Sequence, residues 1–471
     1  MFFNSSTFLM FFLLFFVLYW FVTARNLKLQ NILILFASYV FYGWWDWRFV
    51  GLLILSTLID YGFGLLIYNK PGRRKLYLWL SIFNNLVILC FFKYFNFFAE
   101  SFETLMSQFG METHPYVLAI VLPVGISFYT FHGMSYVLDI YNGKVVPTRN
   151  FVDYAVFVCF FPLLVAGPIE RANHLLPQVV KPRQFSYTQA MEGLRLIVWG
   201  LFKKIVIADT LAGSVNTIFS DYAHYPGSTL VLGVIYFSFQ IYGDFSGYTD
   251  IALGVAKLLG FELLTNFKFP YFSRDIAEFW RRWHVSLSSW FRDYVFIPLG
   301  GSRGGKVKAI RNIFIIFLLS GFWHGANWTY IAWGAFHALL YVPLFVFNWN
   351  RAHTDKIVAY DGMLPSVKEF LQIVLTFVLV AIGWVFFRSA SIHDALEYFR
   401  HIGHGLFTKP TELDGLKLVA VFLFMDWFAR KEERNPHPYI PHILYLVAMT
   451  TLLLVFGKGT NENIEFIYFQ F

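Results

Sequence analysis

The sequence predicts an all-α polytopic membrane protein, and three observations support that fold class. Hydrophobic residues make up 57% of the 471 residues and charged residues only 14%, whereas a soluble domain carries about 25% charged residues. Apolar runs long enough to cross a hydrocarbon layer of about 30 Å recur along the whole chain. Basic and non-basic loops alternate between the first of these runs. We expect one domain (residues 1–471) with about twelve membrane segments, some of them re-entrant.

The first five predicted spans can be oriented by the loops that follow them. We place these spans at residues 7–22, 31–42, 49–68, 76–98 and 116–131. Basic residues follow the first, third and fifth spans, for example at Arg25, Arg73 and Lys144, and Lys and Arg are retained on the cytoplasmic side. The N-terminus is therefore predicted outside. The first span has no basic leader and no small-residue cleavage site, so we expect it to be retained.

The later segments are less regular. Residues 151–166 are apolar but short, and both flanks have cytoplasmic character, so we predict a re-entrant segment covered by protein. Residues 194–207 and 230–242 are predicted to form a hairpin around an outer loop. Further apolar segments are expected at residues 251–264, 310–322, 330–347, 370–387, 417–428 and 440–456.

The charge and the cysteines exclude some functions. The net charge is +8, and the basic residues lie in short loops between spans. They therefore indicate membrane topology and not nucleic-acid binding. Cys90 and Cys159 both lie in apolar stretches. We expect them to pack as ordinary hydrophobic residues and to form neither a disulfide nor a zinc site.

Residues 244–250, with the sequence DFSGYTD, fit two interpretations. Asp244 and Asp250 beside a glycine could form a functional site, with Asp244 lining it. However, Asp, Ser and Thr also cap helices, and glycine favours turns, so the same residues fit a helix end followed by a turn. The sequence leaves both interpretations open.

A basic stretch over residues 268–308 has no spanning run and is predicted to lie on the cytoplasmic face. Within it, Trp280, His284, Leu287 and Phe291 are spaced as one stripe of a helix. The spacing predicts an amphipathic helix with His284 in its apolar face and with Arg281 and Arg282 turned away from that face. A lone histidine on such a face is more often a packed core residue than a catalyst.

The segment Trp323-His324-Gly325-Ala326-Asn327-Trp328 interrupts two long apolar runs. Polar and titratable groups at membrane depth are costly, so they mark a functional site by default. An imidazole has an unperturbed pKa of about 6.5 and can accept a proton near neutral pH. We therefore predict that His324 is a general base, which is the role that acyl transfer to a hydroxyl requires. Trp323 and Asn327 are candidate residues of the same site.

Other kinds of site are less well supported by the motifs. The sequence contains no HxxxH or HExxH pattern, so we predict no metal site. The glycine-rich basic loop at residues 298–308 could bind phosphates or anionic lipid headgroups, although it is not a P-loop. These residues alone are compatible with a membrane enzyme or with a transporter centred on His324.

Two stretches carry a more specific resemblance. FWRRWHVSLSSWFRDYVFIPLGG (residues 279–301) and GFWHGANWTYIAWGAFH (residues 321–337) resemble the signature of membrane-bound O-acyltransferases. The similarity is strongest to the bacterial alginate O-acetyltransferase branch. LPVGISFYTF (residues 122–131), AGPIER (residues 166–171), the DFSGYTD segment and FIYFQF (residues 466–471) are also similar to that branch.

The resemblance implies a bundle of helices around a central tunnel in the bacterial inner membrane. It implies that His324 is the family's membrane histidine and that His284 is its second histidine, with Trp280, Arg281 and Arg282 near the donor. The implied donor is acetyl-CoA on the cytoplasmic side, with no bound cofactor. The implied acceptor is an exported polysaccharide, reached with a periplasmic partner of serine-hydrolase-like fold. Relatives that transfer D-alanine to teichoic acid leave the acceptor open.

Overall fold

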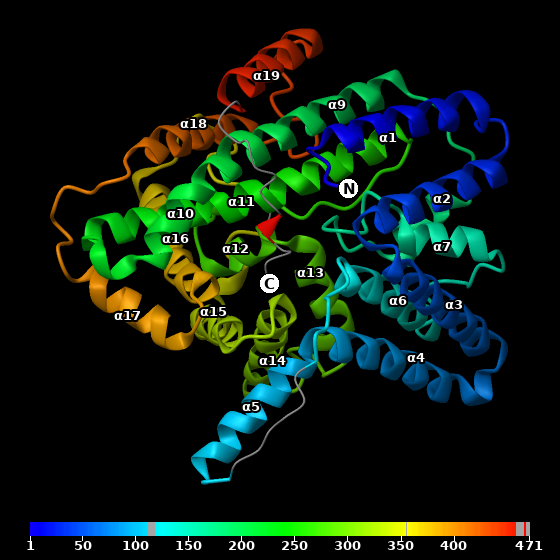
Figure 1. The fold of residues 1–471 in the computed structure, drawn as a ribbon, viewed down its shortest axis with the longest axis horizontal. Helices are drawn as coiled ribbons and strands as arrows, with labels where there is room; N and C mark the ends of the chain where they lie inside the picture. Colours follow the sequence, from blue (N-terminus) through cyan, green and yellow to red (C-terminus); the bar gives the residue numbers. More distant parts are fainter. Residues whose placement is uncertain (112–117, 355, 458–465, 468–471) are drawn as a thin grey trace. The chain divides into compact units, whose positions relative to one another are not determined.

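A computed structural model describes residues 1–111, 118–354, 356–457 and 466–467 of the chain (Figure 1). All the regular elements among these residues are helices. They form two compact units: Met1–Tyr187 with Ala256–Leu264, and Thr188–Val255 with Thr265–Phe471. The all-helical prediction is confirmed for the described residues.

The first unit contains the helices near the N-terminus. They are α1 (Ser6–Val17), the π-helical turn Leu18–Val22, α2 (Leu27–Asp46), α3 (Arg48–Asn69), α4 (Arg74–Leu89), the π-helical turn Cys90–Tyr94, α5 (Phe95–Gln108), α6 (Ile126–Tyr141), α7 (Phe151–Cys159) and α8 (Ala172–Val179). Asp60 of α3 is buried and accepts hydrogen bonds from Ser81 and Asn85 of α4, at 2.7 and 2.8 Å. These bonds satisfy a carboxyl group that would otherwise be costly to bury.

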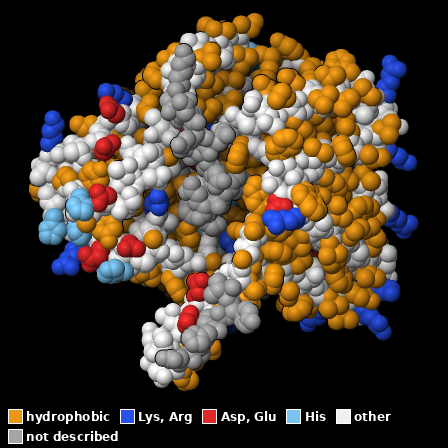
Figure 2. Space-filling view, in the orientation of Figure 1, with side chains coloured by type: hydrophobic (Ala, Val, Ile, Leu, Met, Phe, Trp, Pro, Cys, Tyr) orange, Lys and Arg blue, Asp and Glu red, His pale blue; other side chains and the backbone are white. Residues whose placement is uncertain are grey.

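Several helices have the length and composition of membrane spans. Five of them meet these criteria among the described residues: Arg48–Asn69, Pro71–Gln108, Lys306–His324, Trp328–Val346 and Val367–Arg388. Ser6–Val22 and His442–Phe456 are shorter apolar helices. The face of the first unit seen in Figure 2 is dominated by hydrophobic side chains, and α3 and α4 expose residues such as Leu55, Trp79 and Phe83. The chain is therefore a multi-pass membrane protein, while the count of about twelve segments stays a prediction.

Two predicted segments of the first unit differ from the observed helices. The predicted span at residues 116–131 begins outside the described residues, and helix α6 starts only at Ile126. Residues 151–166 form α7 up to Cys159 and then a series of turns. The helix therefore ends before the apolar run does, and the re-entrant path stays a prediction.

The second unit contains the rest of the chain. Its helices are α9 (Tyr187–Leu201), the π-helix Phe202–Asp209, α10 (Thr210–Ser220), α11 (Gly227–Leu258), α12 (Ile276–Arg282), α13 (Val285–Phe291), α14 (Lys306–His324), α15 (Trp328–Val346), α16 (Val367–Arg388), α17 (Ile392–Ile402), α18 (Asp414–Ala429) and α19 (His442–Phe456). The predicted hairpin at residues 194–242 is formed by α9 to α11, with a turn near Asp221.

The interpretation of residues 244–250 as a turn was wrong, because they lie inside the continuous helix α11. Gly247 serves close packing here. A Cβ atom at this position would lie 2.7 Å from the carbonyl oxygen of Gly200 in α9. The acidic side chains are paired with the neighbouring helix, since Lys204 lies 2.6 Å from Asp244 and Lys203 lies 2.6 Å from Asp250.

The predicted amphipathic helix through His284 was also wrong. Helix α12 ends at Arg282, Trp283 is extended, and His284 has a φ of 43° in the left-handed region. Helix α13 then begins at Val285. A left-handed residue breaks a helix, so the periodic stripe over residues 280–291 does not exist in one element.

Helices α14 and α15 form an antiparallel hairpin and pack along each other (Figure 1). Two glycines allow this close approach. A Cβ atom at Gly321 would overlap the carbonyl oxygen of Tyr330, and one at Gly334 would overlap the carbonyl oxygen of Phe317. Both obstacles are backbone atoms, which cannot rotate away. The hairpin therefore fixes the end of α14, where His324 lies, against α15.

We expect Gly334→Ala to destabilise the protein by about 1–3 kcal/mol, because the new methyl group overpacks the α14–α15 interface. Gly62→Ala in α3 is the matched control, since a Cβ atom there meets nothing within 4 Å. Alanine has the higher helix propensity, so the control variant should be equally stable or more stable. Thermal unfolding in detergent distinguishes the two. A melting temperature for Gly334→Ala at or above that of the wild type would contradict this prediction.

Candidate active site

His324 is the last residue of α14, and the residues after it explain why the helix stops there. Gly325 adopts an extended conformation, and a side chain at this position would overlap the ring of Tyr330. The side chain of Asn327 caps α15 by accepting a hydrogen bond from the N–H of Thr329 at 3.0 Å. Its amide nitrogen donates to the carbonyl oxygen of Ala390 at 2.9 Å. Asn327 thus has a capping role in the hairpin.

The structure brings the two predicted histidines together. His284 precedes α13 and is 1% exposed, His324 is 4% exposed, and their ring centroids are 6.4 Å apart. The backbone N–H of Val285 donates to Asn266, which holds the turn that carries His284. Forty residues of sequence separate two imidazoles that lie side by side in the second unit.

Aromatic rings enclose both histidines. The ring of Trp323 lies 5.6 Å from His284 and 4.8 Å from His324, centroid to centroid. Phe245 of α11 lies 4.7 Å from His284. On the other side, Trp333 and Phe387 each lie 5.2 Å from His324. The imidazoles therefore work in a dry environment of low polarity, where a positive charge is poorly solvated.

Burial lowers the pKa of His284 to about 3, so this imidazole is neutral at physiological pH. A neutral imidazole has one nitrogen that donates and one that accepts a hydrogen bond. It can therefore orient a hydroxyl group or a neighbouring base without introducing a charge. Among the described residues, no group of three or more His, Cys, Asp or Glu side chains could hold a metal ion.

A cavity of about 920 Å³ lies in the second unit close to the two histidines. Its apolar wall follows α14 and α15, and its last residue on α14 is Ser320. Ser320 and His324 are four residues apart on the same helix face, so the cavity reaches to within one turn of His324. Trp280 of α12 also lines the cavity, with its ring 5.1 Å from that of Phe317 in α14. The size is in the range of sites for small-molecule ligands and cofactors.

The cavity is lined by many more basic than acidic side chains. Its lining contains eight Lys and Arg side chains and two Glu side chains. The basic ones are Lys268, Arg281, Arg282, Arg292, Arg351, Arg430, Lys431 and Arg434. A concave basic wall raises the local concentration of anions. The arrangement fits a ligand that carries phosphate or other anionic groups.

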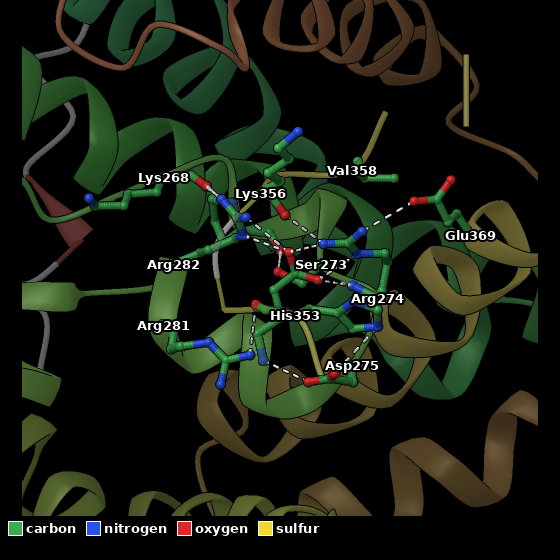
Figure 3. Close-up of polar contacts among 12 residues, drawn as sticks. Lys268, Ser273, Arg274, Asp275, Arg281, Arg282, His353, Lys356, Val358 and Glu369 are labelled. Atoms are coloured by element: carbon green, nitrogen blue, oxygen red, sulfur yellow. Dashed lines mark hydrogen bonds and ion pairs between the residues drawn. The ribbon is translucent and has the colours of Figure 1, made fainter. Parts of the chain in front are cut away.

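Arg281 and Arg282 hold part of this wall in place (Figure 3). Arg281 donates to the carbonyl oxygens of Asn350 and His353 at 2.8 and 3.0 Å. Arg282 donates to Glu278 at 3.0 Å and to the carbonyl oxygen of Lys268 at 3.2 Å. Both side chains line the cavity, and both also support the surrounding loops, while their place near the donor stays a prediction.

Asp244 does not touch either histidine and has a supporting position. Its carboxylate pairs with Lys204 and accepts the backbone N–H of Ile467 at 2.7 Å. Phe466 packs against Phe245, at 5.9 Å between ring centroids, and Phe245 packs against His284. The segment at residues 466–471 was singled out in the sequence, but residues 468–471 lie outside the described ones.

Sequence reasoning missed Phe245, Trp333 and Phe387 as neighbours of the histidines. Aromatic residues make up 21% of the chain, so no single one stands out by composition. The motif around His324 extends to Trp333, and helix spacing after Gly325 could have suggested that this indole returns toward His324.

The model of one protein family matches residues 41–375, which include His284, His324 and most residues of the cavity. The chain belongs to the membrane-bound O-acyltransferase family. This acyltransferase is 41% identical over 469 residues to a Pseudomonas syringae pv. tomato protein described as "Probable alginate O-acetylase AlgI", covering 98% of the chain and 83% of the relative.

Two further relatives are named for peptidoglycan and for teichoic acid. A peptidoglycan O-acetyltransferase of Helicobacter pylori is 33% identical over 410 residues, covering 80% of the acyltransferase and 74% of the relative. A teichoic acid D-alanyltransferase of Bacillus subtilis is 32% identical over 290 residues, covering 57% and 69%. The family assignment confirms the predicted resemblance and makes the chain an O-acyltransferase.

Proposed function

We propose that this acyltransferase takes an acetyl group from acetyl-CoA at the cytoplasmic side of a bacterial inner membrane and passes it on for O-acetylation of an exported polysaccharide such as alginate. The observation that carries the proposal is the pair of buried imidazoles, 6.4 Å apart, one helical turn beyond a cavity with a basic wall. The similarity to alginate O-acetylases over nearly the whole chain supports the choice of acyl group and acceptor.

In this proposal His324 is the general base. It accepts the proton of the attacking hydroxyl group while the hydroxyl oxygen bonds to the carbonyl carbon of the thioester. The carbon–sulfur bond then breaks, and the leaving thiolate takes up the proton. His284 is the second catalytic residue, which orients the hydroxyl group or His324 as a neutral hydrogen-bonding partner. Trp323 excludes water from both.

The donor occupies the cavity in this proposal. Acetyl-CoA has phosphate groups at one end and a thioester on a long neutral arm at the other. The basic wall suits the phosphates, while the apolar floor along α14 leads the arm toward His324. Arg351 also lines the cavity, and its guanidinium group has no side-chain hydrogen bond or ion pair within the described part of the chain, so it can bind phosphate directly.

We assign the remaining steps to the outer face. A periplasmic partner of serine-hydrolase-like fold completes the transfer to the polysaccharide, as the resemblance to the alginate branch implies. The two compact units act as a single domain, since the family match crosses from one to the other. The tunnel that links the donor cavity to the outer face is part of the same proposal.

The test uses vesicles that contain the purified protein and acetyl-CoA labelled on the acetyl group. Extracts of exported polysaccharides and of the periplasm are added on the outer side, and the label in polymer and protein is counted. We expect donor-dependent label in a polysaccharide or in a periplasmic protein, and none in vesicles without the acyltransferase.

A parallel arm offers a D-alanyl thioester on a carrier protein together with a teichoic acid. This arm is included because the Bacillus subtilis relative is a teichoic acid D-alanyltransferase. Transfer of D-alanine without any transfer from acetyl-CoA would overturn the proposal in favour of this second function. Absence of acetyl transfer in the presence of complete periplasmic extract would exclude acetyl-CoA as the donor.

A further inference from the structure

The end of the α14–α15 hairpin opposite His324 carries a group of exposed cations. Residues 294–354 contain five Lys and Arg residues and no Asp or Glu. Arg303, Lys306 and Lys308 lie close together in this stretch, and all three are exposed. Within the described parts of the chain, no ion pair involves any of them. Three positive charges therefore lie at one end of the hairpin without an acidic partner among the described residues.

Exposed apolar side chains lie beside these cations. Val307, between the two lysines, is 83% exposed, and Ile297 and Leu299 in the preceding loop are 58% and 40% exposed. Single exposed apolar residues are ordinary, but several in one place mark a contact with a membrane or with another molecule. The loop and the first turn of α14 therefore combine positive charge with apolar surface.

Helix α15 brings two aromatic rings to the same end of the hairpin. Nζ of Lys306 donates a hydrogen bond to the carbonyl oxygen of Val346 at 3.4 Å, so the start of α14 lies beside the end of α15. Phe347 and Trp349 follow, with their rings stacked at 5.1 Å between centroids and each residue 60% exposed. Tryptophan is enriched at the boundary between hydrocarbon and headgroups. Because both helices have the length and composition of membrane spans, we expect this end of the hairpin to lie at that boundary.

The combination of cations and apolar side chains narrows down the partner. A nucleic acid or an acidic peptide would pair with the cations and leave the apolar side chains in water. A zwitterionic lipid would cover the apolar side chains but bring no net negative charge. An anionic phospholipid satisfies both, with its acyl chains beside the apolar groups and its phosphate at the level of the basic ones.

The donor cavity is a different site. Ser302 belongs to its lining, whereas Arg303, Lys306 and Lys308 do not. The phosphates of a donor in that cavity therefore do not account for these three cations. Since Arg303 follows Ser302 directly, the cations lie next to the rim of the cavity.

We propose that the basic hairpin end, which consists of Arg303, Lys306, Val307, Lys308 and Trp349, is a binding site for an anionic phospholipid such as phosphatidylglycerol. The cations bind the phosphate of the headgroup by charge-assisted hydrogen bonds. Val307 and Trp349 lie against the upper part of the acyl chains. This inference concerns a lipid site and is independent of which acyl donor and which acceptor the enzyme uses.

The test uses the purified, full-length protein in vesicles of dioleoylphosphatidylcholine with increasing amounts of phosphatidylglycerol that is brominated on its acyl chains. Bromine quenches tryptophan fluorescence at short range, and the signal of Trp349 is the difference between the protein and its Trp349→Phe variant. Brominated phosphatidylcholine provides the reference. We expect phosphatidylglycerol to be preferred at Trp349 by about tenfold or more, since each basic residue near an anionic surface contributes about fivefold in affinity.

Two variants remove the proposed contacts with the headgroup. Lys306→Gln combined with Lys308→Gln should lower the preference to within about threefold of unity. Arg303→Gln alone should lower it about fivefold. Arg303 lies in the glycine-rich loop outside the helix, so this second variant keeps the test valid even if the double variant does not fold.

A matched control removes two other lysines of the same unit. Lys356→Gln is combined with Lys417→Gln, because these lysines are also exposed but pair with Asp361 and Asp414. The control changes the net charge by the same amount as the double variant at the hairpin end. It should keep the preference of the wild type for phosphatidylglycerol.

Several outcomes would overturn the inference. Equal quenching by the two lipids in the wild type would do so, as would a preference that survives in the double variant at the hairpin end or disappears in the control. Soluble anions test the other partners. Replacing sodium chloride by sodium phosphate or by polyglutamate at equal ionic strength should leave the preference unchanged. Its loss would assign the cations to free phosphate or to an acidic protein segment instead.

Discussion

Replacement of His324 by alanine is expected to lower the rate of acyl transfer by at least about 100-fold, which is the lower range for loss of general acid–base catalysis. The imidazole lies at the end of α14, enclosed by Trp323, Trp333 and Phe387. Its ring centroid lies 6.4 Å from that of His284, which burial keeps neutral. The measurement is the initial rate of label transfer in vesicles, with donor binding determined in parallel.

The design separates catalysis from folding. Donor binding by His324→Ala should stay within about threefold of the wild type, since the cavity lies one turn away and keeps its basic wall. His393→Ala is the matched control, because His393 is an exposed histidine of α17. Full transfer activity in a well-inserted His324→Ala protein would remove this residue from the chemistry.

Replacement of Glu278 by alanine is expected to destabilise the protein by about 3–5 kcal/mol, the usual cost of leaving buried charges without their partner. The carboxylate is 1% exposed and pairs with two arginines, Arg274 at 3.0 Å and Arg282 at 2.9 Å. Burial alone would raise the pKa of Glu278, but these two guanidinium groups hold it below its usual value. Figure 3 labels Arg274 and Arg282, and dashed lines mark their hydrogen bonds and ion pairs.

Loss of these ion pairs should also disturb the cavity, because Arg282 and the neighbouring Trp280 both line it. We expect a lower melting temperature and weaker binding of acetyl-CoA. Glu278→Gln keeps the shape and hydrogen-bonding oxygen of the side chain without its charge. Its melting temperature and its affinity for acetyl-CoA should lie between those of Glu278→Ala and those of the wild type. Glu432→Ala is a control at an exposed acidic residue that lines the cavity. Equal stability of Glu278→Ala and the wild type would show that the pairs contribute nothing.

The helical class and most helix positions could be predicted from the sequence, because membrane spans are determined by long apolar runs. The DFSGYTD segment shows where this fails. Glycine, Asp and Ser favour turns in isolation, but here Gly247 lets α11 approach α9, and lysines on the opposite helix neutralise the acids. Both causes lie in the packing partner, which is invisible in a local pattern.

The site was predictable in its two main residues and not in its geometry. The local spacing of apolar residues predicted that His284 lies within one helix. In the structure His284 has a positive φ and separates two helices. The contact between His284 and His324 was not predicted, since nothing in the spacing of residues 284 and 324 implies a distance of 6.4 Å between their ring centroids. His337 received no role, because an imidazole in an apolar run is ordinarily a satisfied core residue. Only the structure shows that its nitrogens are not satisfied by the described residues.

The hydrogen bond from Ile467 to Asp244 has a consequence for the biosynthesis of the protein. The two residues are 223 positions apart in the chain. At 5–20 residues per second, a ribosome needs roughly 10–45 s to synthesise the chain from Asp244 to Ile467. Phe466, which covers Phe245 behind His284, arrives only at the end of this interval. A nascent chain that already contains both histidines therefore lacks one wall of their surroundings until Phe466 has been translated.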